Sequence, residues 1–247
     1  MKKNKMMRAA FALMVITMLT MSIVSGTFAK YVTEGGANDK ARVAMFGVTV
    51  EGSSDLFAQN YVKTSNVPGS ENLTVKSSKS EDVVAPGTQS KADGMKISVK
   101  GEPEVAVKVE FSVTAAKDIY LKKANDLPDR TNKAEKFNND SDYYPVKFTL
   151  TKGSTPLVTD GKLSDVKTAL EGATVTKEYA AGTNLNTEIG DYVLKWKWDY
   201  DDADGNGTYD KQDTLLGDLA AKTVTIDSDL YNLDTEFAVT VKVTQVD

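Results

Sequence analysis

Residues 105–113 read VAVKVEFSV and contain the most regular pattern in the chain. Apolar side chains recur there at every second position, which is the repeat of a β-strand. They are Val105, Val107, Val109, Phe111 and Val113. Polar and charged residues such as Lys108 and Glu110 lie between them. A strand with one apolar and one polar face is typical of an antiparallel sheet whose inner side packs on a core.

Similar patterns on both sides of this stretch define the fold class. Strands are expected at 41–50, 95–99, 145–151, 173–179, 192–198 and 237–243. Two short helices are expected at 163–170 and 214–222, the second with Asp213 as its N-cap. Residues 53–93 and 122–144 are polar and read as long surface loops, with a short strand at 73–75 in the first. The absence of a βαβ rhythm predicts an all-β, antiparallel, two-sheet sandwich of jelly-roll type.

The N-terminal segment has the layout of a secretory signal peptide. Four basic residues precede an apolar run at 9–24, and Thr27 and Ala29 are the small residues of a cleavage site before Lys30. The apolar run is short for a membrane span, which needs about 20 residues, although an uncleaved N-terminal anchor is the alternative. The predicted parts are therefore a signal peptide at 1–29, a polar leader at 30–40 and a single domain at 41–247.

Composition excludes several classes of function. The chain has no cysteine and no histidine, which removes disulfides, histidine-based acid–base catalysis and histidine-ligated zinc. Loss of residues 1–29, with four positive charges, would change the formal net charge from −5 to −9. Such an acidic chain argues against a nucleic-acid partner. We expect no enzymatic activity, and no membrane association after processing.

One acidic stretch fits the spacing of a calcium loop. Residues 202–213 read DADGNGTYDKQD, with a glycine at the sixth position, where such loops turn most sharply. A structural calcium ion would use ligands from the first, third, fifth, seventh, ninth and twelfth positions, which are Asp202, Asp204, Asn206, Thr208, Asp210 and Asp213. The alternative is a solvated hairpin loop in which Asp213 only caps the following helix.

Both tryptophans of the chain lie on one face of the strand expected at 192–198. Trp196 and Trp198 are separated by Lys197, so their indoles point the same way. Core packing is the simpler interpretation, and a face that stacks on carbohydrate is the alternative.

Several short motifs together resemble the TasA/camelysin family of secreted biofilm-matrix fibre proteins of Gram-positive bacteria. GTFAKYV at 26–32 is similar to junctions cut by the SipW-type signal peptidase. The other similar segments are ARVAMFGVTV at 41–50, VVAPGT at 83–88, GEPEVAVKVEF at 101–111, WKW at 196–198, DTLLG at 213–217 and VTVKVTQVD at 239–247.

The resemblance implies a secreted subunit of extracellular-matrix or cell-surface fibres. In such fibres the mature N-terminal segment of one subunit would insert as a strand into the next copy of the chain. That donor strand would begin with Lys30, Tyr31, Val32, Thr33 and Glu34. A monomeric calcium-stabilised adhesin or carbohydrate-binding module is the alternative function.

Overall fold

The structure is a computed structural model that describes residues 42–53, 56–57, 61–63, 74–75, 82–129, 135–172, 175–199 and 208–246. Contacts divide the chain into two compact units, Met1–Ala44 and Met45–Asp247. All the strands and helices described below belong to the second unit.

The larger sheet is built around β13 (Asp191–Trp198), which pairs along both of its edges. On one side it pairs with β10 (Val146–Lys152), which continues to β11 (Thr155–Gly161). On the other side it pairs with β5 (Met95–Gly101) and β4 (Thr88–Gln89). Three further strands complete the sheet: β1 (Val48–Gly52) beside β5, then β2 (Tyr61–Lys63) and β3 (Thr74–Val75) beyond β4.

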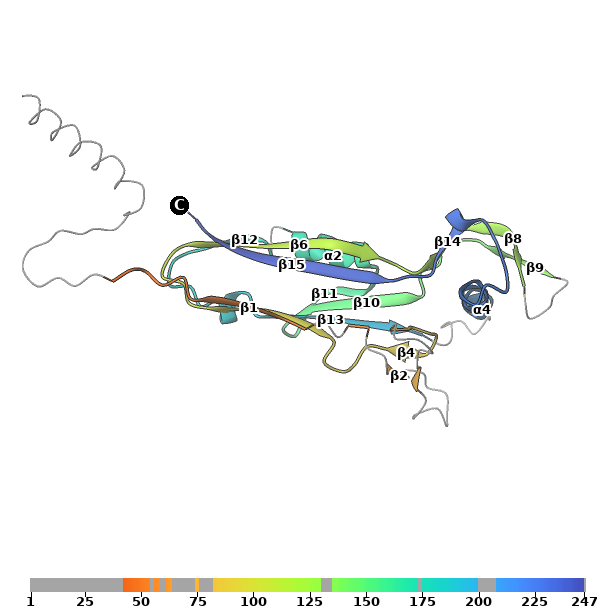
Figure 1. Cartoon of the computed structure of the whole chain (residues 1–247), viewed down its shortest axis with the longest axis horizontal. Coiled ribbons are helices and arrows are strands. Elements are labelled where there is room, and N and C mark those ends of the chain that lie inside the picture. Colours follow the sequence, from red (N-terminus) through yellow and green to blue (C-terminus); the bar gives the residue numbers. More distant parts are fainter. Residues whose placement is uncertain are drawn as a thin grey trace, which may run out of the picture. The chain divides into compact units, whose positions relative to one another are not determined.

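The second sheet has three strands, with β6 (Val107–Lys117) between β12 (Lys177–Tyr179) and β15 (Glu236–Gln245). Every pairing in both sheets is antiparallel. The two sheets form the two layers seen in Figure 1. The expected fold class, an all-β antiparallel sandwich with a few short helices, is confirmed.

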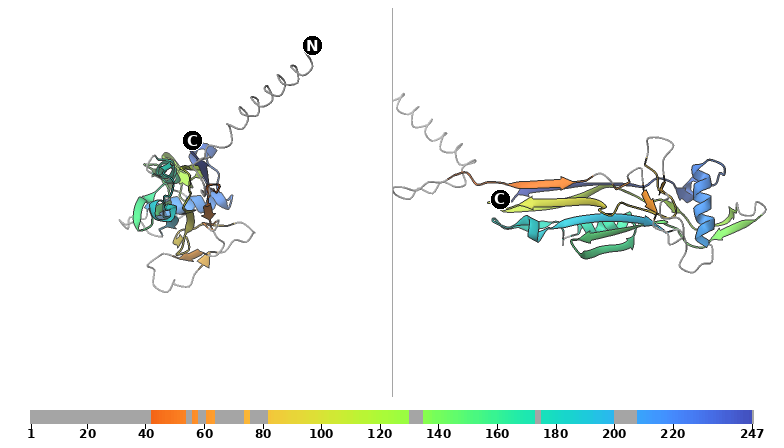
Figure 2. Two further views of the ribbon diagram at one scale, coloured as in Figure 1. Left: turned by 90° about the vertical axis from the view of Figure 1, so that its left-hand side faces the viewer. Right: turned by 90° about the horizontal axis from the view of Figure 1, so that it is seen from below.

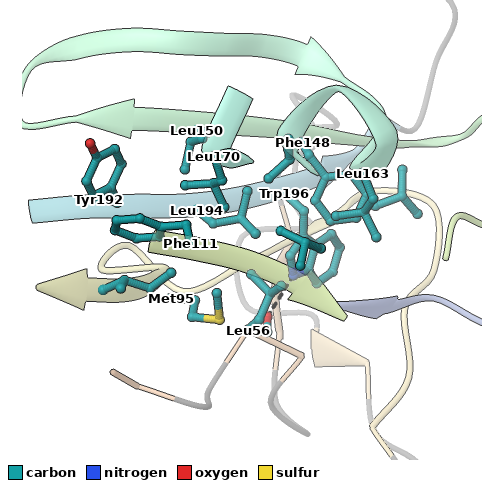
Figure 3. Packing of buried hydrophobic residues seen from close by; sticks show 14 of the residues in the cluster. Leu56, Met95, Phe111, Phe148, Leu150, Leu163, Leu170, Tyr192, Leu194 and Trp196 are labelled. Carbon is teal, nitrogen blue, oxygen red and sulfur yellow. Dashed lines mark hydrogen bonds between the residues drawn. The ribbon is translucent and has the colours of Figure 1, made fainter. Parts of the chain in front are cut away.

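The core lies between the two layers. Phe148, Leu150 and Leu194 of the larger sheet are at most 1% exposed, and Phe111 of β6 faces them (Figure 3). The Phe111 and Tyr192 rings meet edge to face with centroids 5.2 Å apart, a favoured aromatic geometry. The apolar alternation recognised in these strands therefore marks the inward face of each sheet.

Helix α2 (Leu163–Glu171) closes one flank of the sandwich. Leu163, Val166 and Leu170 are fully buried, as their helical spacing predicts, and α2 contacts β6, β10 and β11. Two carboxylates accept hydrogen bonds from backbone N–H groups at its start. Leu163 N donates to Asp118 Oδ1 at 3.0 Å, and Lys162 N donates to Asp165 Oδ2 at 2.9 Å. Such capping compensates for the missing intrahelical bonds of the first turn.

The stretch 122–144 is not a simple surface loop, and this prediction is wrong. It contains a bulged hairpin of β8 (Ala124–Pro128) and β9 (Lys136–Asn139), preceded by β7 (Tyr120–Leu121), which pairs with β14 (Tyr231–Asn232). Leu127 and Phe137 are buried by this pairing. The stretch is mostly polar and only a few of its residues face the core, so its sequence does not show the apolar alternation by which a hairpin is predicted.

Helix α4 (Thr208–Ala220) begins before the expected segment 214–222. Asp213 lies inside α4 and is not its N-cap. Two short helical turns were not predicted, α3 (Leu185–Glu188) and the 3-10 turn η1 (Ser228–Leu230).

The strand expected over 41–50 is shorter in the structure. Residues 42–47 have no regular structure, and β1 begins at Val48. Phe46 and Val50 are 41% and 44% exposed, so the expected half-buried face is largely open. Strand β11 was not predicted, because Thr155–Gly161 carries few apolar residues and is mostly exposed.

Candidate functional site

Most of the site residues proposed from sequence lie outside the described residues. This is the case for the cleavage site at Ala29 and Lys30, and for the donor residues Tyr31, Val32, Thr33 and Glu34. It is also the case for Asp202, Asp204 and Asn206 of the calcium loop. The structure does describe the domain that would receive a donor strand.

One flank of the sandwich is bordered by β1 in the larger sheet and β15 in the smaller sheet, and we call it the β1/β15 flank. The two strands lie at the same side of their layers in Figure 1 and in the right-hand view of Figure 2. Among the described residues β1 pairs only with β5, and β15 only with β6. Within the part of the chain that the structure describes, each strand therefore has one edge of backbone N–H and C=O groups without a neighbouring strand.

The apolar row along this flank is incompletely covered. On β15 the residues that alternate toward the core are half-buried, whereas their partners on β6 are buried or nearly so. The half-buried row is Phe237, Val239, Val241 and Val243. On β1, Val50 is 44% exposed although its ladder partner Val99 is 1% exposed. Exposed apolar side chains beside unpaired strand edges are typical of a surface that pairs with another chain.

The other edge of β6 pairs with β12 over Val107–Val109 and is bonded by side chains beyond it. Glu171 accepts from Val113 N at 2.8 Å, and Lys167 donates to Val113 O at 2.9 Å. Thr176 Oγ1 accepts from Phe111 N at 3.1 Å. These bonds satisfy the N–H and C=O of Val113 and the N–H of Phe111, next to the stretch of β6 that pairs with β12.

The chain joins the domain at a tight contact next to β1. Met45 N donates to Glu104 Oε2 at 2.8 Å, and Glu104 N donates to Met45 O at 2.9 Å. Gly101 has a φ of +126°, and a Cβ on it would lie 2.0 Å from Gly47 O. Only glycine fits this close approach, which holds the start of β1 against the turn after β5.

Asp213 of α4 lies in a separate polar cluster at the end of β13. Its Oδ1 accepts hydrogen bonds from Tyr143 Oη at 2.7 Å and Trp198 Nε1 at 3.1 Å. Burial is the main cause that raises the pKa of Asp213 to about 7, because it penalises the charged form. The Tyr209 ring stacks on Tyr143 with centroids 5.0 Å apart. The Asp213 carboxyl group, whose pKa is raised, therefore lies among two neutral hydrogen-bond donors, Tyr143 and Trp198, with the Tyr209 ring nearby.

The structure brings few of the proposed calcium ligands together. Asp210 is exposed in the first turn of α4, while Asp213 is turned toward Tyr143 and Trp198. No group of three acidic side chains that could hold a metal ion occurs among the described residues, a set that omits 200–207. A calcium ion at the loop would share the Asp213 carboxylate with these two donors.

The tryptophans do not form an exposed stacking face. Trp196 and Trp198 are 2% and 5% exposed, and Trp196 Nε1 donates to Leu56 O at 2.8 Å (Figure 3). Their indoles are core aromatics, as the simpler interpretation held.

Of the surfaces described above, the β1/β15 flank offers both backbone hydrogen bonding and apolar contact, which are the means of binding a strand.

No family model, no curated protein and no solved structure matches the chain significantly. Within the described residues, no helix is both long enough and apolar enough to span a membrane.

Proposed function

We propose that the protein is a secreted structural subunit that polymerises into extracellular-matrix fibres. Cleavage after Ala29 by a signal peptidase would free the leader of residues 30–40. This leader would add as a strand to the β1/β15 flank of a second copy of the chain. Repetition of that contact in one direction would build a filament, because a head-to-tail contact that does not close gives an open polymer.

The observation that carries the proposal is the β1/β15 flank. An incoming strand would find one edge each of β1 and β15 that has no neighbouring strand among the described residues, and a half-buried apolar row on β15. In strand addition the main-chain hydrogen bonds supply affinity and alternate side chains supply specificity. Tyr31 and Val32 are the first apolar residues of the leader, and pairing that extends to Val43 would add a third.

Three sequence features support secretion and assembly. The basic, then apolar, then small-residue order of 1–29 is that of a secretory signal peptide. The motifs at 26–32, 83–88 and 101–111 resemble those of TasA/camelysin fibre proteins, and we infer that the chain is related to that family. The absence of cysteine fits a domain that gains stability from partners rather than disulfides.

The test compares two chains, residues 30–247 and 41–247, at equal concentration by negative-stain electron microscopy. Filaments from the longer chain alone would support the donor role of the leader. Monomers from both chains would refute it.

A peptide of residues 30–44 provides the matched competitor. Added in excess, it should occupy the flank and block growth of the longer chain, whereas a scrambled peptide should not. Filaments that form equally well with both peptides would show that the leader does not bind the flank.

A structural calcium ion in residues 202–213 is a separate proposal. It would neutralise a dense run of carboxylates and hold the connection between β13 and α4. Asp202→Ala should abolish calcium binding in titration calorimetry and lower the melting temperature only when calcium is present. Unchanged binding and melting would leave the loop without a metal role. The adhesin alternative gains no support from the tryptophans, since both are buried.

A further inference from the structure

The outward face of β10 and β13 is basic, although the chain as a whole has a net charge of −5. The residues of these strands that alternate away from the core include Lys147 on β10 and Lys195 and Lys197 on β13. Lys91 lies beside them in the turn after β4. Asp191, at the start of β13, also faces outward and pairs with Lys96, so the positive charge gathers at the part of this face formed by these four lysines.

These side chains line an open hollow of about 340 Å³. Among the described residues, its wall contains the four lysines together with neutral groups such as Gln89 and Thr149, and no carboxylate. Ammonium, amide and hydroxyl groups are all hydrogen-bond donors. The hollow therefore presents donors and positive charge, which match an anion with several oxygens.

Two of the lysines are placed directly opposite each other. Lys147 and Lys197 are ladder partners of β10 and β13, and like charges at such positions destabilise a sheet. Lys197 is balanced by Asp160 at 3.2 Å and Asp199 at 3.4 Å. Within the described residues, no carboxylate lies within ion-pair distance of Lys147, which is half-buried. Because Asp160 and Asp199 pair with Lys197, Lys147 is the member of the pair that a bound anion would neutralise.

Burial weakens the hydration of Lys147 as well. It lowers the pKa of this ammonium, and the nearby Lys162 acts in the same direction, while Asp160, Asp118 and Asp199 oppose them. A partly dehydrated cation gains more from a bound oxyanion than a fully solvated one, because the local dielectric is lower.

We propose that this lysine hollow binds a linear anionic polymer through its phosphate or carboxylate groups. Lysines on alternate positions of β13 are about 7 Å apart, a spacing that suits charges repeated along a chain. Among the described residues of the wall, the only aromatic one is Trp196, which is 2% exposed and offers no ring for a base to stack on. The hollow therefore favours base-free polymers over single-stranded nucleic acid, whose unpaired bases gain affinity by stacking. The proposal does not rest on fibre assembly, since neither β1 nor β15 lines the hollow.

The test measures binding of end-labelled polymers by fluorescence anisotropy at low salt, with the protein purified in the form in which the expressing cells produce it. The probes are inorganic polyphosphate, polygalacturonate and a single-stranded DNA of equal charge. Lys147→Gln combined with Lys195→Gln removes two charges from the hollow. Lys108→Gln combined with Lys242→Gln removes two positive charges from the smaller sheet and is the matched control. Lys147→Arg combined with Lys195→Arg keeps both charges in the hollow. Circular dichroism checks that each variant folds.

We expect wild type to bind polyphosphate, polygalacturonate or both, and whichever binds identifies the chemical source of the anion. The paired glutamine change in the hollow should weaken binding about tenfold or more, while the control pair and the arginine pair should retain it. The proposal is overturned if neither base-free polymer binds, if both glutamine pairs weaken binding equally, or if DNA binds more tightly than either polymer.

Discussion

Val241 and Phe111 are partners across the β6–β15 ladder, yet Phe111 is 4% exposed and Val241 is only half-buried. The difference arises because β6 has β15 on one side and β12 with α2 on the other, whereas β15 has a strand neighbour on one side only among the described elements. The β1/β15 flank is the consequence, and it can be altered without disturbing the deeper core.

Val241→Glu should prevent filament growth while the monomer still folds. A charge on the half-buried row would oppose an apolar strand, and its cost to the free energy of unfolding should be about 1 kcal/mol, typical of a partly exposed position. Thr240→Glu, on the outward face of the same strand, is the control and should leave filaments intact. Electron microscopy and thermal melting provide the two readings. Equal filament yield from both variants would argue against the flank.

Gly101→Ala should destabilise the attachment of β1. The φ of +126° disfavours any side chain, and the new Cβ would lie 2.0 Å from Gly47 O, so we expect a loss of about 1–3 kcal/mol. Gly52→Ala is the control, because its Cβ would meet nothing within 4 Å. Urea denaturation of both variants measures the difference. A loss at position 52 as large as at position 101 would contradict the close-approach explanation.

Leu170→Ala should cost about 2–5 kcal/mol, since it empties a fully buried site where α2 meets the sheets. Leu157→Ala on β11 removes the same atoms from a side chain that is 38% exposed. Its effect should be much smaller, because little buried volume is lost. Chemical denaturation measures the free energy of unfolding of both variants. Similar losses in the two would mean that the packing of α2 against the sheets is not needed for the stability of the sandwich.

Asp213 should make stability depend on pH near neutrality. Its folded pKa of about 7 lies above the unfolded value of about 3.9. Between these values the folded state therefore binds more protons. The free energy of unfolding should fall as pH rises through this window, by at most about 1.4 kcal/mol per pH unit. Above pH 7 this contribution should level off.

Asp213→Asn keeps an oxygen that can accept a hydrogen bond from Tyr143 or Trp198, but the asparagine side chain does not titrate. The substitution should therefore flatten the dependence of the free energy of unfolding on pH between pH 5 and about 7. Asp210→Asn in the exposed first turn of α4 should not. Denaturation followed by tryptophan fluorescence at several pH values gives the slopes. Identical slopes for wild type and Asp213→Asn would refute the assignment.

The periodic segments of the sequence were sufficient to predict the sandwich. Alternation at 105–113, 145–151, 192–198 and 237–243 located β6, β10, β13 and β15, and helical spacing located α2. The hairpin of β8 and β9 was not predicted, because pairing between neighbouring polar segments buries only isolated residues such as Leu127 and Phe137. Local patterns cannot report such burial, since it depends on what the rest of the chain places above it.

The sequence by itself determined the inward and outward faces of the strands that it predicted, because side chains of a strand alternate whatever its neighbours are. Tertiary structure alone decided which strands are edges. It left Val50 and the β15 row partly uncovered, closed β6 with Glu171 and Lys167, and placed Lys147 opposite Lys197. Edges, closures and charge pairs arise from contacts between distant segments, and a one-dimensional pattern does not contain those contacts.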